Sequence, residues 1–199
     1  MKKVVLQEII FPVHEICREE ELYFYKRDAV YIEDRKEIEI KRGGYLDLGT
    51  YFNGFSIMKW GKYTYADQYS VLLNVKGGIR VGVYQSHLCD FAIVKETLIE
   101  KEVFTHKGRE QIEIALGGID SSGIITVKIQ ALTDNVYFYG GAFQAEIEEK
   151  NISEVSIAIV CCTYKREKYA YRIVKNVTGD HKNSSNIKLF LVDNGNTIK

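Results

Sequence analysis

Apolar and polar residues alternate along the chain up to about residue 150. Because successive side chains in a β-strand point to opposite faces, a period of two predicts strands with one buried face. Five such runs are clear, at residues 38–40, 71–75, 81–83, 112–116 and 125–129.

Glycine-containing turn signals separate these runs, at residues 42–44, 76–78, 106–108 and 120–123. The segment Lys76-Gly77-Gly78, flanked by alternating apolar residues, is the strongest candidate for a hairpin turn. Many short antiparallel strands without helical periodicity between them predict a β-sandwich or jelly roll. The first predicted domain, residues 1–150, is therefore mainly β.

The pattern changes at Glu154. Residues 155–161 are almost continuously apolar, which is typical of a strand buried on both faces of a parallel sheet. An amphipathic helix follows, and a second apolar run occupies residues 187–192. Strand, helix and strand in this order predict a parallel βαβ unit, the start of a Rossmann-like α/β domain at residues 151–199.

Candidate chemistry lies in the loops that follow these two strands. Ligands of open α/β sheets bind beyond the carboxyl ends of the strands. The first loop carries Thr163, Lys165 and Arg166, and the second begins with Asp193. Two cations suit a diphosphate and a carboxylate can accept from a base or ribose, so these residues are candidate nucleotide ligands. No G-x-G-x-x-G or G-x-x-x-x-G-K-[ST] motif is present.

Simpler interpretations of the same residues remain open. Asp193-Asn194-Gly195 is also an ordinary turn sequence after a strand. Lys165 and Arg166 are also compatible with solvated charges at the start of a helix.

The charge balance argues against a generic nucleic-acid binder. Lysine plus arginine number 27 and aspartate plus glutamate number 27, which gives no net charge. The first residues are too polar for a signal peptide, and no run approaches the ~18 apolar residues of a membrane span.

Neither the cysteines nor the histidines have the spacing of a metal site. Cys17, Cys89, Cys161 and Cys162 lack C-x-x-C spacing and are predicted to be free, buried thiols in a reducing cytoplasm. We therefore expect no metal site in this chain.

Two stretches together resemble a known family. VSIAIVCCTYKRE (155–167) and IKLFLVDNGNT (187–197) resemble the first βαβ of family-two inverting glycosyltransferases with the GT-A fold. GTYFNGFSIMKWGKYT (49–64) is similar to the Thr-Tyr-Phe-Asn-x-Phe…Trp…Thr segment of bacterial galactofuranosyltransferases. Those enzymes carry a β-sandwich ahead of the GT-A domain, the order predicted here.

The resemblance implies that the parent protein transfers a sugar from a UDP-sugar donor to a cell-surface glycan acceptor. Galactofuranose is the expected sugar, and another such as rhamnose is left open. Thr163 and Arg166 match positions that contact uridine diphosphate, with Lys165 as a nearby alternative, and Asp193 matches the residue that reads the uracil. The enzyme is expected to be cytoplasmic, and a position at the inner face of the plasma membrane is left open. Homo-oligomerisation and peripheral membrane association of the parent are left open.

The family's Asp-x-Asp metal motif and catalytic aspartate lie downstream of these segments. Residues 1–199 are therefore expected to be a truncated front part without catalytic residues, inactive alone, whose full-length parent uses Mg²⁺ or Mn²⁺. The alternative is a non-catalytic β-sandwich that binds carbohydrate or mediates oligomerisation. Tyr51, Phe52 and Trp60 are candidates for a sugar-stacking platform or for core packing.

Overall fold

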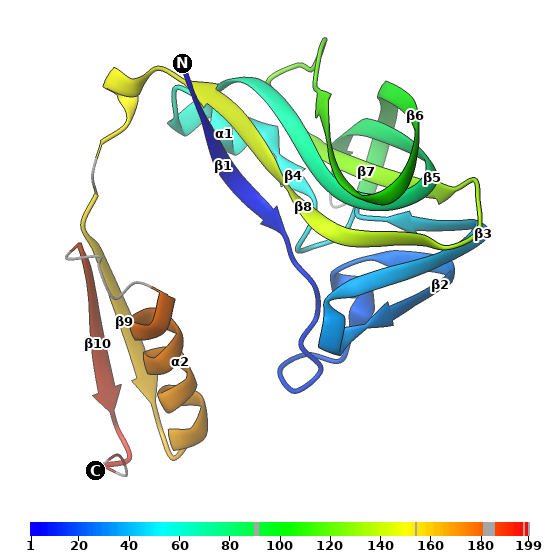
Figure 1. The fold of residues 1–199 in the computed structure, drawn as a ribbon. Coiled ribbons are helices and arrows are strands. Elements are labelled where there is room, and N and C mark those ends of the chain that lie inside the picture. Colours follow the sequence, from blue (N-terminus) through cyan, green and yellow to red (C-terminus); the bar gives the residue numbers. More distant parts are fainter. Residues whose placement is uncertain (90–91, 154, 181–185, 197, 199) are drawn as a thin grey trace. The chain divides into compact units, whose positions relative to one another are not determined.

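The computed structural model describes residues 1–89, 92–153, 155–180, 186–196 and 198 (Figure 1). The chain divides into two compact units, Met1–Asn151 and Ile152–Lys199. Each unit is described by itself.

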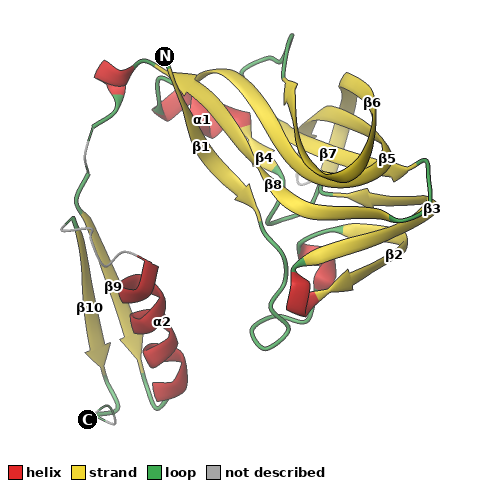
Figure 2. Ribbon diagram, viewed as in Figure 1, coloured by secondary structure: helices red, strands yellow, loops and turns green. Residues whose placement is uncertain are grey.

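The first unit is an antiparallel β structure. Its strands are β1 (Lys2–Ile9), β2 (Tyr25–Ile32), β3 (Glu37–Asp47), β4 (Phe55–Ser56), β5 (Asp67–Cys89), β6 (Ala92–Ala115), β7 (Ile124–Ala131) and β8 (Val136–Ile147). One helix, α1 (Ile57–Tyr63), and 3-10 turns at Glu20–Leu22, Glu33–Arg35 and Glu149–Asn151 complete it (Figure 2).

Two long strands of this sheet, β3 and β5, each pair with two different partners, β7 and β8, along their length. The strand order is β1-β8-β3-β7-β5-β6, with β2 beside β3 and β4 beside β7. β5 pairs with β8 over residues 67–76 and with β7 over residues 79–86, and β3 is divided between the same two partners. The sheet consequently folds back on itself around one core, which confirms the predicted mainly β, antiparallel sandwich.

The core follows the predicted alternation. Every second residue of the five runs is buried, for example Ile38, Val71, Val81 and Ile125. Burying an aliphatic side chain of this size contributes about 1.5–3 kcal/mol, so the repeated pattern is a main source of stability for this fold.

The predicted hairpin turn at residues 76–78 is wrong. β5 continues through these residues, and its register against β6 shifts between Val75 and Gly77. Gly77 has φ +98°, and a Cβ there would lie 2.7 Å from Cγ2 of Val136. The glycine therefore bends one long strand between its two partners instead of ending it.

Two other turn signals also lie inside strands, residues 42–44 in β3 and 106–108 in β6, whereas residues 120–123 do connect β6 to β7. Helix α1 was not expected either. It is only seven residues long, and its Trp60 packs on Phe55 with ring centroids 6.3 Å apart. Tertiary packing, not helical periodicity, accounts for so short a helix.

The second unit has the predicted strand–helix–strand form. It consists of β9 (Ile157–Thr163), α2 (Glu167–Asp180) and β10 (Ile187–Asp193). β9 and β10 are parallel, in register from Ile157↔Ile187 to Thr163↔Asp193. Ala170 of α2 is buried.

The expectation that the apolar runs are buried on both faces is wrong within this unit. Alternate residues Val160, Phe190 and Val192 are exposed. A single helix covers one face of two strands, so the opposite face keeps its apolar side chains in contact with solvent.

Among the described side chains, the cysteines are free, but they are not all buried. Cys17 and Cys161 are half-buried, and Cys162 is exposed. Cys162 alternates with Cys161 along β9 and therefore lies on the uncovered face of that strand. The side chain of Cys89 lies outside the described residues.

Candidate functional site

The carboxyl ends of β9 and β10 form one edge of the two-stranded sheet. Asp193 stands opposite Thr163 in the register, and the backbone N–H of Asn194 donates to the carbonyl of Thr163 at 2.9 Å. Parallel pairing thus brings the loop after β9 and the loop after β10 side by side. All four nucleotide candidates belong to these loops or to the strand ends that lead into them.

Thr163 offers an unsatisfied hydroxyl at this edge. The residue is 8% exposed, and its Oγ1 is buried without a hydrogen-bond partner among the described residues. Buried hydroxyls are nearly always hydrogen-bonded, to protein, water or ligand. Oγ1 is therefore available as both donor and acceptor.

The carboxylate of Asp193 shapes its own loop. Oδ1 accepts from the backbone N–H of Gly195 at 2.9 Å, and Oδ2 accepts from that of Ile198 at 2.7 Å. The turn interpretation of this sequence is therefore correct as a description of the chain. Both carboxylate oxygens of Asp193 thus take part in closing the loop.

Lys165 and Arg166 occupy the first loop, and both are exposed. Lys165 has a left-handed backbone conformation, with φ +51°. A Cβ added to Gly195 would lie 3.1 Å from the backbone nitrogen of Lys165. Glycine at residue 195 thus lets the two loops approach closely. The carbonyl of Arg166 accepts from the backbone N–H groups of Tyr169 and Ala170. Arg166 is therefore the residue that immediately precedes α2.

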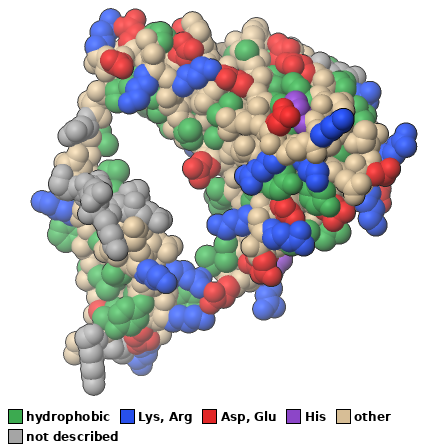
Figure 3. Space-filling model, viewed as in Figure 1, with side chains coloured by type: hydrophobic (Ala, Val, Ile, Leu, Met, Phe, Trp, Pro, Cys, Tyr) green, Lys and Arg blue, Asp and Glu red, His purple; other side chains and the backbone are tan. Residues whose placement is uncertain are grey.

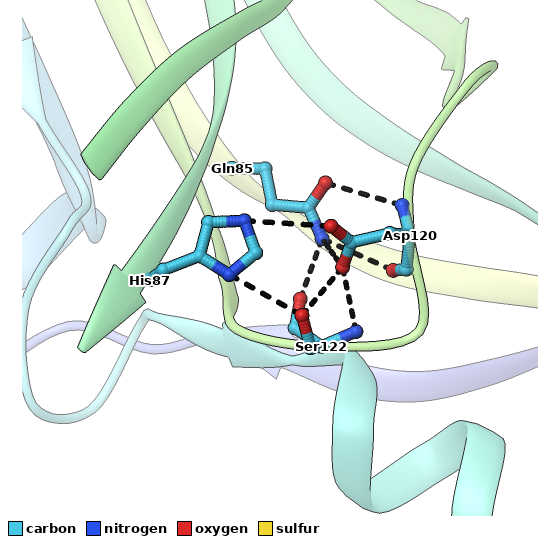
Figure 4. Close-up of polar contacts among 4 residues, drawn as sticks. All are labelled: Gln85, His87, Asp120 and Ser122. Atoms are coloured by element: carbon cyan, nitrogen blue, oxygen red, sulfur yellow. Dashed lines mark hydrogen bonds and ion pairs between the residues drawn. The ribbon is translucent and has the colours of Figure 1, made fainter. Parts of the chain in front are cut away.

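A second polar cluster lies in the first unit, between the end of β5 and the loop before β7 (Figure 4). Gln85 donates from Nε2 to Oδ1 of Asp120 at 2.9 Å and accepts from the Asp120 N–H at 3.2 Å. His87 contacts Ser122 Oγ through Nδ1 at 3.2 Å and Asp120 Oδ2 through Nε2 at 3.5 Å.

This cluster has the residue types of a catalytic triad but different connections. Ser122 donates from Oγ directly to Oδ1 of Asp120 at 2.7 Å, and its backbone N–H donates to the same oxygen at 2.8 Å. In a nucleophilic triad the serine proton goes to the histidine, and the carboxylate orients that histidine from the other side. Here the carboxylate closes its own turn, and the cluster anchors the loop to β5.

The Ser122 hydroxyl, followed by the Ser122 backbone N–H, lowers the pKa of Asp120 below its ordinary value. Both hydrogen bonds favour the charged carboxylate. The loop anchor is therefore an ionised group under neutral conditions.

The family of the chain is decided by a match along most of the first unit. The family model described as "Galactofuranosyltransferase 2 N-terminal" matches residues 6–146. The chain belongs to this galactofuranosyltransferase N-terminal family. A search of curated proteins finds no match.

Two solved carbohydrate-binding modules share a distant likeness with this galactofuranosyltransferase N-terminal chain. The C-terminal family 6 carbohydrate-binding module of LamC from Zobellia galactanivorans is 8% identical, with a TM-score of 0.38, over 61% of this chain and 91% of that one. A family 29 module from Piromyces equi is 11% identical, with a TM-score of 0.39, over 71% and 89%. Likenesses at this level carry no argument about ligands.

The family-like segment 49–64 has a structural role in this galactofuranosyltransferase N-terminal unit. Asn53 is fully buried; its Nδ2 donates to the carbonyls of Ile10 and Tyr23 at 3.0 and 2.6 Å, and its Oδ1 accepts from the Ile10 N–H at 2.9 Å. One side chain thus joins three segments of the backbone. Sequence reasoning did not assign this role to Asn53, although an asparagine between two aromatic residues and a glycine was a visible signal.

Two of the three aromatic residues considered for a stacking platform make separate packing contacts. Phe52 stacks on Tyr23 with centroids 4.6 Å apart, whereas Trp60 packs on Phe55. Tyr51 is exposed.

No cluster of three or more His, Cys, Asp or Glu residues able to hold a metal ion occurs within the described part of the chain. The described helices include none that is long and apolar enough to cross a membrane. Lys, Arg, Asp and Glu side chains are interspersed over the face of the first unit seen in Figure 3.

Proposed function

We propose that this chain is part of an inverting glycosyltransferase that transfers galactofuranose from a UDP-sugar donor to a glycan acceptor. The family match over residues 6–146 supports the glycosyltransferase assignment. The parallel pairing of Thr163 with Asp193 carries the donor-site proposal, because it gathers a hydroxyl, two cations and a carboxylate at one sheet edge.

Each residue has a role that follows from its chemistry. Lys165 and Arg166 neutralise the diphosphate, aided by the positive end of the α2 helix dipole. Thr163 Oγ1 gains the hydrogen bond that it lacks in the free chain. Asp193 accepts from an N–H of the uracil while it holds its own loop closed.

A divalent cation is part of this proposal for the parent enzyme only. The described residues do not provide a set of metal ligands. No metal-binding or general-base role is therefore assigned to residues 1–199.

Titration of the 199-residue chain with UDP, followed by NMR or calorimetry, tests the donor site. We expect Arg166→Ala and Asp193→Asn to weaken UDP binding about tenfold each, since each removes a charge-assisted contact. Lys175→Ala is the matched control, because this exposed cation lies on α2 away from the loops, and it should leave the affinity unchanged.

Uridine alone, added in parallel, separates the two contacts. Arg166→Ala should affect UDP more than uridine, whereas Asp193→Asn should affect both. Absence of UDP binding, or equal binding by all variants, would overturn the donor site.

A further inference from the structure

The outer face of the first unit's sheet has a hollow of about 410 Å³ where β3, β7 and β5 lie side by side. Its lining includes Tyr45, Asp47, Arg80, Tyr84, Lys128 and Gln130. Their neighbours along each strand, such as Leu46, Val81 and Ile129, are buried in the core. Since side chains alternate along a strand, the lining residues share the opposite face.

The strand register places these residues in adjacent rows. Tyr45 and Arg80 both stand opposite Gln130, from its two sides, and Asp47 stands opposite Lys128. With strands ~4.8 Å apart, Tyr45 on β3 and the β5 residues lie roughly 10 Å apart across β7, a width that suits one or two sugar rings.

The side chain of Tyr84 lies over Gly82, where the absence of a Cβ leaves room for the tyrosine ring. A Cβ at Gly82 would lie 2.8 Å from Cε2 of Tyr84 and 3.0 Å from its hydroxyl oxygen. Lys128 Nζ is 4.6 Å from the centroid of this ring, and Arg27 Cζ is 4.9 Å from that of Tyr45. The two aromatic side chains at the hollow are thus held in position by their neighbours before any ligand arrives.

The hollow is lined by positively and negatively charged groups, and part of their hydrogen-bonding capacity is unused. Arg80 donates from Nη1 to Gln130 Oε1 at 3.0 Å, and no carboxylate pairs with it among the described residues. Its remaining N–H groups and the Gln130 amide protons are therefore donors for a ligand. Acceptor capacity comes from Asp47, which lies 3.7 Å from Lys128 Nζ.

We propose that this hollow binds a sugar unit of a glycan. A sugar ring has hydroxyls that both donate and accept and a C–H face that packs against an aromatic ring, which matches planar polar groups beside two tyrosines. A purely anionic ligand fits less well, because Asp47 and Glu96 both lie beside Lys128. The site belongs to the first unit and is independent of the proposed donor site.

The test uses the intact 199-residue chain on an array of furanosyl and pyranosyl oligosaccharides of galactose, arabinose, glucose, mannose and rhamnose. The strongest hit is then titrated in solution. Tyr45→Ala and Arg80→Gln should each lower its affinity about tenfold. Tyr137→Ala is the matched control, since that tyrosine also has a cation, Lys76, 5.3 Å from its ring centroid but lies outside the hollow.

Circular dichroism checks the fold of each variant, and Arg80→Gln decides the matter if Tyr45→Ala does not fold. A hit that weakens in both variants and not in Tyr137→Ala supports the site. Absence of saccharide binding up to about 20 mM overturns it, as does binding that either ignores both substitutions or falls equally in Tyr137→Ala. We expect UDP binding to be the same in the Tyr45, Arg80 and Tyr137 variants as in the wild type. The result for the sugar site is therefore separate from the result for the donor site.

Discussion

Asn53 donates to the carbonyl of Tyr23 at 2.6 Å from a fully buried position, and so joins the segment before β4 to the segment before β2. The same amide bonds both backbone groups of Ile10. We predict that Asn53→Ala lowers the free energy of unfolding by about 2–4 kcal/mol, because three hydrogen bonds of a fully buried amide are lost. Both backbone groups of Ile10 lose this partner, whereas the Tyr23 carbonyl keeps the hydrogen bond from Thr50 Oγ1.

Urea denaturation measures this loss. Asn74→Ala is the control, since Asn74 accepts one long bond of 3.4 Å from Gln111 at the surface, and it should cost less than about 0.5 kcal/mol. Equal effects of the two substitutions would contradict the role given to Asn53.

Gly141 of β8 lies directly against the backbone of β5. A Cβ at this residue would overlap the backbone carbonyl of Leu72, which has no room to move within the sheet. Gly141→Ala should therefore lower the free energy of unfolding by about 3 kcal/mol. Gly108→Ala in β6, where nothing lies within 4 Å of the new Cβ, should leave the thermal midpoint unchanged or slightly higher.

Glu113 links four strands through its carboxylate. It accepts from Lys3 Nζ at 2.7 Å, Ser70 Oγ at 2.9 Å and Gln144 Nε2 at 2.8 Å. The Lys3 contact, followed by that of Ser70, lowers the pKa of Glu113.

A lowered pKa in the folded state stabilises the protein above the ordinary pKa of glutamate, and this stabilisation is lost as the pH falls through the folded value. Because the side chain is 39% exposed, solvent screening reduces its contribution, and Glu113→Gln should cost about 0.5–1 kcal/mol at pH 7. The difference from the wild type should shrink in urea melts near pH 3. Glu102→Gln, which replaces an exposed carboxylate of the same strand, is the matched control.

The Asp120 anchor predicts a local titration. Because the pKa of Asp120 is lowered, its carboxylate stays ionised and hydrogen-bonded to the Ser122 N–H until the pH falls below the ordinary range of aspartate. The amide proton shift of Ser122, followed by NMR, should titrate with a midpoint below the ordinary pKa of aspartate. Ser122→Ala removes the hydroxyl donor and should raise that midpoint at Asp120; an unchanged midpoint would exclude the hydroxyl as the cause.

The sequence predicts the buried face of the sandwich well, because alternation depends only on neighbouring residues. Val71, Val81 and Ile125 are all buried where the period of two places them. The turn predicted at Gly77 is wrong because a glycine signals equally a turn that ends a strand and a bulge that bends it. Only the pairing of β5 with both β7 and β8 distinguishes these cases, and this pairing joins residues far apart in sequence.

The same limit applies to the two candidate sites. Thr163 and Asp193 could be placed at one edge because parallel strands carry their following loops to the same side. Tyr45 and Arg80 could not, since their common neighbour Gln130 belongs to a strand many residues later. A tyrosine on the polar side of an alternating strand was the available signal, but alternation alone does not identify neighbouring strands.

β1 pairs with β8 from Lys2↔Ile147 to Ile9↔Gly141, so the first unit begins and ends on adjacent strands. During synthesis, the ribosome must deliver residue 147 before the opening strand finds its partner, which delays closure until nearly the whole unit has emerged. Once closed, a module with neighbouring ends can be grafted into a surface loop of an unrelated host with little distortion of either protein.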